Sequence, residues 1–178
     1  MIQMKFPHMA LNAEDVPAPR YKMWNTQEVP ASHSADQILA WTAAVAQGAP
    51  GGKLGSLVIT CHGYEVKSRG GYGLQLGTGI QRRHTALFGG LKGLLSEIHI
   101  VACQAAQISD PGTSGDGDGN LFCCEIAKNA GVNVYASTAM QTPGLWNDLW
   151  GIPYGKIDDY EGNVYRWRPD GSCRLVRL

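Results

Sequence analysis

The chain has 178 residues, a length that suits one domain with a substantial hydrophobic core. Its 15 basic residues balance its 15 acidic residues, so no overall charge attracts nucleic acid or an anionic membrane. The five cysteines are an odd number and form no C-x-x-C pair, which favours reduced thiols. Because no segment has the apolar length of a signal peptide or a membrane span, we expect a cytoplasmic protein, or one exported without a cleaved signal peptide.

Residues 1–33 are rich in proline and polar residues and show no sustained hydrophobic period. We expect them to form an N-terminal extension laid over a single domain of residues 34–178. Ser34 and Gln37 fit a capping box, and apolar residues then recur at helical spacing, so a helix is predicted from there to Gln47.

The apolar run Leu57–Cys61 predicts a buried strand, and the glycine-rich residues 70–80 predict a short hairpin or flap after it. Leucines that share one helical face predict a second helix between about His84 and Leu95. A second buried strand is expected at Ile98–Ala102. The polar, glycine-rich residues 107–120 then predict a solvated, mobile loop.

A third helical stripe runs from Phe122 to Ala130 and ends at Gly131, where a left-handed cap is usual. Residues 132–137 predict a third strand. This alternation of helices and strands is typical of an α/β fold, here a three-layer sandwich with a mostly parallel central sheet. Residues 162–178 contain two alternating runs around an Asp-Gly turn, which predict a C-terminal β-hairpin.

His62 and Cys103 each follow the carboxyl end of a predicted strand. Consecutive strands joined by a right-handed crossover tend to lie side by side with their carboxyl ends at one edge, so we expect the two residues to meet there. A thiol beside an imidazole can act as a cysteine nucleophile with a proton-transfer partner. The backbone N–H groups of Gly63 and Cys103 could hold the developing oxyanion.

An apolar strand that ends in His-Gly and another that ends in Ala-Cys, in "LVITCHGY" and "IHIVACQAA", resemble a clan of cysteine peptidases. The clan includes caspases, legumains, gingipains, separases and the self-cleaving domains of bacterial toxins. The resemblance covers about residues 34–140 and is strongest to the short bacterial forms, among them effectors and toxins. Val101 and Ala105 depart from the caspase signature, and His62 precedes Cys103 by 41 residues, slightly fewer than in caspases.

The resemblance implies a caspase-like endopeptidase that needs no cofactor and cleaves peptide bonds through a thioester acyl-enzyme. In it, Cys103 is the nucleophile, His62 its partner and Gly63 an oxyanion donor. Gln104, Ser137 and Thr138 are candidate contacts of a protein or peptide substrate. The loop of residues 107–120 is a candidate for self-processing, and the arginines with which caspases bind aspartate have no counterpart that the sequence reveals.

Other readings of the same residues remain open. A catalytically silent, caspase-like module could use the same cleft to bind a peptide without cutting it. A zinc site at His62 and Cys103 lacks a ligand pair with the usual close spacing. The "DGDGN" segment resembles the start of a calcium loop, but Leu121 and Ala127 replace its required glycine and glutamate. We expect neither a metal nor nucleic acid nor a membrane as a partner.

Overall fold

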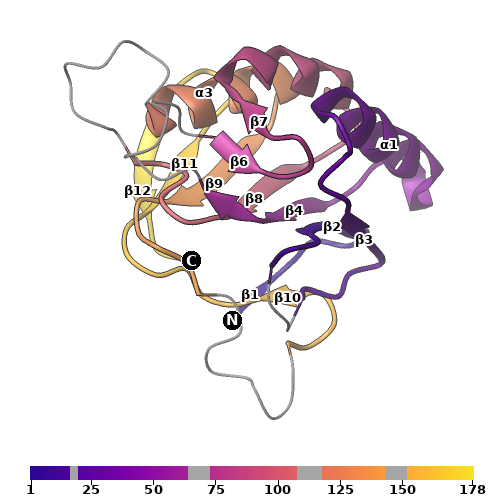
Figure 1. Cartoon of the computed structure of the whole chain (residues 1–178), viewed down its shortest axis with the longest axis horizontal. Coiled ribbons are helices and arrows are strands. Elements are labelled where there is room, and N and C mark those ends of the chain that lie inside the picture. Colours follow the sequence, from indigo (N-terminus) through magenta and orange to yellow (C-terminus); the bar gives the residue numbers. More distant parts are fainter. Residues whose placement is uncertain (17–19, 64–72, 108–117, 143–151) are drawn as a thin grey trace.

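The computed structural model describes residues 1–16, 20–63, 73–107, 118–142 and 152–178. It is a mixed α/β structure built on a mostly parallel sheet of seven strands (Figure 1). The sheet order is β12-β11-β9-β8-β4-β2-β3, with five parallel strands followed at one edge by two antiparallel ones. The strands are β2 (His8–Ala13), β3 (Asn25–Val29), β4 (Ser56–Thr60), β8 (Glu97–Val101), β9 (Asn133–Ser137), β11 (Val164–Trp167) and β12 (Cys173–Val176).

The two central strands are buried over their whole length. All five residues of β4 and all five of β8 are buried, as expected for parallel strands that are covered on both faces. They pair in register from Ser56 with Glu97 to Thr60 with Val101. The predicted strands at residues 57–61 and 98–102 are therefore confirmed, each one residue earlier in the chain.

The N-terminal residues do not lie over the domain as an extension. β2 occupies the sheet between β3 and β4, and all six of its residues are buried. Its sequence hides this position because His8 and Asn12 are polar and the flanking residues are rich in proline. The expectation for residues 1–33 is therefore corrected, since this segment supplies two strands of the central sheet.

The first predicted helix is confirmed as α1 (Ala35–Gly48), with Ser34 at its N-cap and the complete capping box. The second is a 3₁₀ helix, η2 (Arg82–Leu91), that begins just before His84 and ends before the predicted end at Leu95. The third is α3 (Gly119–Ala130), which ends at Gly131 with a left-handed φ of 69°. A short 3₁₀ turn, η1 (Pro50–Gly52), follows α1.

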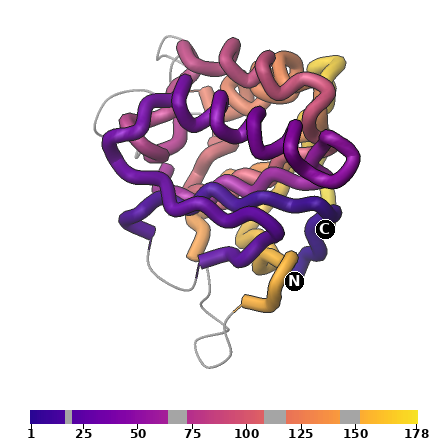
Figure 2. The backbone as a smooth tube through the Cα atoms, turned by 90° about the vertical axis from the view of Figure 1, so that its right-hand side faces the viewer, coloured from indigo at the N-terminus to yellow at the C-terminus, as the bar shows by residue number. Residues whose placement is uncertain are grey.

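The two faces of the sheet have different covers. Helices α1, η2 and α3 contribute to the core on one face, and Figures 1 and 2 show them together on one side of the strands. Non-helical segments cover the other face, where residues 152–160 pack with the N-terminal residues. Two short strands join these segments, because β1 (Ile2–Gln3) pairs antiparallel with β10 (Lys156–Ile157).

A separate small sheet follows β4. It consists of β5 (His62–Gly63), β6 (Gly73–Gln75) and β7 (Ile80–Gln81), all paired antiparallel. This is the glycine-rich hairpin predicted after the first strand, within the part of it that the structure describes. None of the helices in the described residues is long and apolar enough to cross a membrane.

A buried polar group links the N-terminal segment to β8. The carboxylate of Glu97 is 5% exposed and accepts hydrogen bonds from Lys5 and from the Ser56 hydroxyl, the latter at 2.7 Å. The His99 ring lies 3.3 Å from the same carboxylate and stacks on Tyr135. Burial raises the pKa of Glu97, but the hydrogen bonds from His99, Lys5 and Ser56 outweigh it and bring the pKa down to about 2.

Glu97 should therefore make the protein sensitive to acid. Because its folded pKa lies below its unfolded value of 4.5, its contribution is complete above that pH and is lost as the pH falls toward 2. Over that range the loss is on the order of 3 kcal/mol. Chemical denaturation between pH 7 and pH 2.5 should show a shallower decline in unfolding free energy for Glu97→Gln than for the wild type. Equal slopes would contradict this role of the carboxylate.

Candidate active site

The carboxyl ends of β4 and β8 remain paired beyond the last residues of the two strands. The N–H of Cys61 donates a hydrogen bond to the carbonyl of Val101 at 3.4 Å, one residue past Thr60. His62 is the second residue after β4, and Cys103 is the second residue after β8. The sheet therefore delivers both residues to the same edge, where open α/β sheets place their ligands.

Gly63 makes the contact that closes this edge. A Cβ atom built on Gly63 would lie 1.9 Å from the carbonyl oxygen of Cys103 and 3.0 Å from its carbonyl carbon. Only a residue without a side chain allows two backbones to come so close. The chain that carries His62 is thus packed directly against the chain that carries Cys103.

Gln75 fixes the position of this contact. Its side-chain Nε2 donates a hydrogen bond to the carbonyl of Gly63 at 2.8 Å, and its backbone pairs with His62 in the β5–β6 ladder. The His62 side chain is exposed at the surface. An imidazole in that position can exchange protons with solvent and with a bound substrate.

The Cys103 sulfur is half-buried and lies against the peptide of residue 141. The N–H of Gln141 donates to Sγ at 3.4 Å, and the thiol lies 3.5 Å from the Gln141 carbonyl, to which it can donate. Cys103 thus has hydrogen-bonding groups placed for both the thiolate and the thiol form.

The residue after Cys103 adopts a constrained backbone conformation. Gln104 has a φ of 54°, the left-handed region, and among the described residues it is the one non-glycine with a positive φ. Its N–H donates to the carbonyl of Ala139 at 2.9 Å, and the N–H of Ala106 donates to Ser137 at 3.1 Å. These bonds fasten the loop after β8 to the chain that leaves β9, and they turn the backbone sharply just after the thiol.

The other four thiols lie in different surroundings. Cys61 and Cys123 are buried, and burial raises the pKa of each thiol well above its usual range. Cys124 is half-buried in α3. Cys173 is exposed on β12, and its pKa is also raised by partial burial. The thiol at the sheet edge beside the His-Gly segment is Cys103.

The three candidate substrate contacts differ in access. Ser137 is fully buried, and its hydroxyl donates to the carbonyl of Glu161 and accepts from the N–H of Ala139. It holds the loop after β9 in place, which corrects the expectation that it meets substrate. Gln104 and Thr138 are both partly exposed near the thiol-bearing loop.

The expected mobile loop lies mostly outside the described residues, which exclude 108–117. At its far end, Asp118 caps α3 and Gly119 and Asn120 already belong to that helix, so this end is ordered structure rather than loop. Within the part of the chain that is described, no three His, Cys, Asp or Glu side chains are grouped to hold a metal ion.

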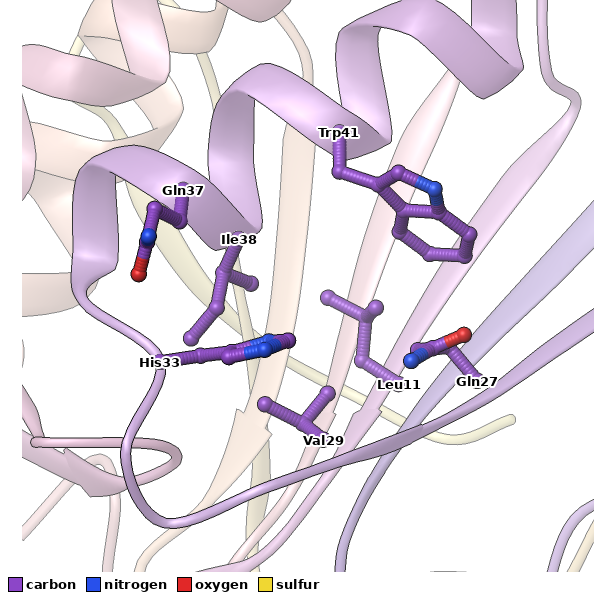
Figure 3. Close-up of a pocket in the computed structure, with 7 residues that line it drawn as sticks. All are labelled: Leu11, Gln27, Val29, His33, Gln37, Ile38 and Trp41. Atoms are coloured by element: carbon purple, nitrogen blue, oxygen red, sulfur yellow. The ribbon is translucent and has the colours of Figure 1, made fainter.

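A pocket of about 260 Å³ lies between α1 and the edge strand β3 (Figure 3). Trp41 of α1 forms one wall, and Figure 3 shows His33 and Ile38 on the same side of the hollow as Gln37. None of its lining residues comes from the segments that carry His62 and Cys103. It is therefore a feature separate from the candidate site.

Sequence reasoning did not find two residues that shape the site. Gln75 holds Gly63, and Gln141 holds the Cys103 sulfur through its backbone. Both act through hydrogen bonds to distant backbone groups, for which the sequence has no periodic signal. Gln75 lies in the predicted flap, whereas Gln141 lies beyond the last parallel strand in a segment without a motif.

The site therefore belongs to a mixed α/β protein that carries a thiol and an imidazole at the carboxyl edge of a parallel sheet. Comparison of the chain with protein-family models and with curated proteins finds no match.

The contact at Gly63 predicts the effect of adding one methyl group. Gly63→Ala should destabilise the fold by roughly 1–3 kcal/mol or more, because the new Cβ would overlap the Cys103 carbonyl. Thermal unfolding followed by circular dichroism measures the loss. Gly89→Ala is the matched control, because its Cβ would meet no atom within 4 Å. Equal melting temperatures for the two variants would contradict the close approach.

The left-handed backbone at Gln104 leads to a different expectation. Glycine adopts this conformation without the cost of about 1–2 kcal/mol that an L side chain incurs. Gln104→Gly should therefore keep or raise the unfolding free energy, whereas Gln104→Val should lower it by more than 1 kcal/mol. Urea denaturation separates these results, and greater stability of the valine variant would show that residue 104 is not left-handed.

Proposed function

We propose that this protein is a caspase-like cysteine endopeptidase whose catalytic dyad is His62 and Cys103. The observation that carries the proposal is the packing of Gly63 against the Cys103 backbone, which brings together the segments that carry His62 after β4 and Cys103 after β8. The exposed imidazole and half-buried thiol at this edge have the access that a reaction with a peptide requires.

The chemistry follows from these groups. The Cys103 thiolate attacks the scissile carbonyl, and His62 takes up the thiol proton and gives it to the leaving amine. The products of this step are a thioester on Cys103 and the released amine fragment. Water then attacks the thioester, which frees the acid fragment and restores the thiol. The N–H groups of Gly63 and Cys103 are our proposed donors to the oxyanion of both tetrahedral intermediates.

The finer assignment of the fold is part of the same proposal. We infer a caspase-like sandwich with a C-terminal β-hairpin, supported by the parallel order β2, β4, β8 and β9 and by the antiparallel pairing of β11 with β12. The substrate is a protein or peptide, with Gln104 and Thr138 as contacts near the scissile bond. Self-processing in residues 107–120, and a cytoplasmic location or export without a cleaved signal peptide, complete the proposal.

A peptide-binding module without catalysis is the second candidate. It is favoured by the hydrogen bonds of the Cys103 sulfur. Because the sulfur is bonded to the N–H and the carbonyl of Gln141, it is already partnered within the protein when no substrate is bound. In this case the same edge would hold an extended peptide without any reaction at the thiol.

Digestion of a peptide library by the purified protein tests the enzyme directly. The wild type should cleave a subset of peptides, and Cys103→Ala should abolish cleavage, because no other group replaces the nucleophile. His62→Ala should lower the rate by roughly 10²–10⁴-fold, the usual contribution of general acid–base catalysis. Binding of peptides without any cleavage by the wild type would establish the second candidate instead.

Thiol labelling tests the dyad without a substrate. Limiting iodoacetamide at about pH 7, followed by peptide mapping, should label Cys103 before the exposed Cys173, whose raised pKa keeps it protonated. His62→Ala should slow the labelling of Cys103 toward the rate of Cys173. The dyad is refuted by faster labelling of Cys173 in the native protein, or by a Cys103 rate that ignores the loss of His62.

A further inference from the structure

Gln141 is buried beside the candidate nucleophile, and its side chain is fully engaged. Its Nε2 lies within hydrogen-bond distance of three carbonyls, those of Ala139 at 3.2 Å, Met140 at 3.1 Å and Glu161 at 3.0 Å. Its Oε1 accepts from the N–H of Glu161 at 3.2 Å. With 9% of the residue exposed, these bonds are shielded from water.

The reciprocal bonds with Glu161 determine where the backbone of residue 141 lies. An amide that donates to a carbonyl and accepts from the N–H of the same distant residue is fixed in both position and orientation. Ser137 strengthens the arrangement, because its hydroxyl also donates to the Glu161 carbonyl. The segment after β9 is thus fastened to residue 161 at two points, on either side of Ala139.

The backbone of Gln141 in turn faces the sulfur. Its N–H points at Cys103 Sγ from 3.4 Å, and its carbonyl lies 3.5 Å from the same atom. A hydrogen bond to an ionised acceptor is roughly twice as strong as one between neutral groups, whereas S–H is a weak donor. The N–H of residue 141 therefore favours the thiolate more than its carbonyl favours the thiol.

From this geometry we infer that Gln141 is a positioning residue: its buried amide holds its own N–H against Cys103 and so sustains the reactive thiolate. This role deepens the proposed peptidase function, on which its catalytic meaning rests.

Gln141→Met tests this role, because methionine fills a similar volume but replaces the amide donors and acceptor with a thioether. We expect iodoacetamide labelling of Cys103 at pH 7 to slow by about tenfold, the consequence of losing a bond to a charged group. The pH at which labelling reaches half its maximal rate should rise, because the hydrogen bond that favours the thiolate is weakened. A shift in this profile is a signature that a loss of packing alone does not produce.

Gln3→Met is the matched control. The Gln3 Nε2 also donates to two backbone carbonyls, those of Met4 and Gly155, but neither of these residues is hydrogen-bonded to the Cys103 sulfur. Its removal should leave the labelling profile of Cys103 unchanged. Thermal unfolding shows whether each variant is folded at the assay temperature, and Gln141→Asn, which keeps an amide one methylene too short to reach Glu161, replaces Gln141→Met if that variant unfolds.

The outcomes separate the two proposals. Slowed, pH-shifted labelling in the Gln141 variant supports the positioning role even if the wild type cleaves no peptide, in which case the peptidase proposal alone fails. A folded Gln141 variant with a wild-type labelling profile overturns the positioning role even where peptide cleavage is observed. A profile that shifts equally in Gln3→Met would also overturn it, because the effect would then be general.

Discussion

The parallel pairing of β4 with β8, extended past the strand ends by the packing of Gly63 on Cys103, is the constraint on which the site depends. Five residue pairs in register make β4 and β8 end side by side, so the segments that follow them leave the sheet at the same level along the strand direction. The close approach at Gly63 then fixes their lateral separation. A shift of one residue in either strand would turn its side chains to the opposite face and move Gly63 out of register with Cys103.

The rest of the structure supports this edge from two sides. On one face, η2 packs between α1 and α3 over the sheet and supplies Phe88 and Leu91 to the core. On the other face, the segment around Tyr160 and Glu161 bonds both to the chain after β9 and to the His99 region. The sulfur environment is therefore built from segments distant in sequence, which only the folded sheet brings together.

The sequence predicted the elements whose signals are local. The capping box at Ser34, the left-handed cap at Gly131 and the apolar runs of β4 and β8 each depend on neighbouring residues, and each is present in the structure. The prediction failed for β2, because polar His8 and Asn12 interrupt its short apolar run and the flanking residues are rich in proline. The spacing of the leucines predicted an α-helix, whereas the residues that η2 buries, Thr85, Phe88 and Leu91, follow the three-residue spacing of a 3₁₀ helix.

For the site, strand order was enough to predict that the ends carrying His62 and Cys103 would share an edge, and the contact at Gly63 explains why glycine follows the histidine. The roles of Gln75 and Gln141 could not be predicted, because each depends on a side-chain hydrogen bond to the backbone of another segment, Gly63 for Gln75 and Glu161 for Gln141. The prediction that Ser137 contacts substrate was wrong for the same reason, since nothing in its local sequence shows that its hydroxyl is buried against Glu161.

The most direct measurement of the central claim is the capture of the acyl-enzyme. The protein is mixed with a peptide pool, quenched in acid after short times and analysed by intact mass and peptide mapping. The account predicts a transient mass increase on the peptide that contains Cys103, removed by hydroxylamine as expected for a thioester and greatly reduced in His62→Ala. Peptide cleavage that proceeds with no adduct on Cys103 and survives in Cys103→Ala would contradict it.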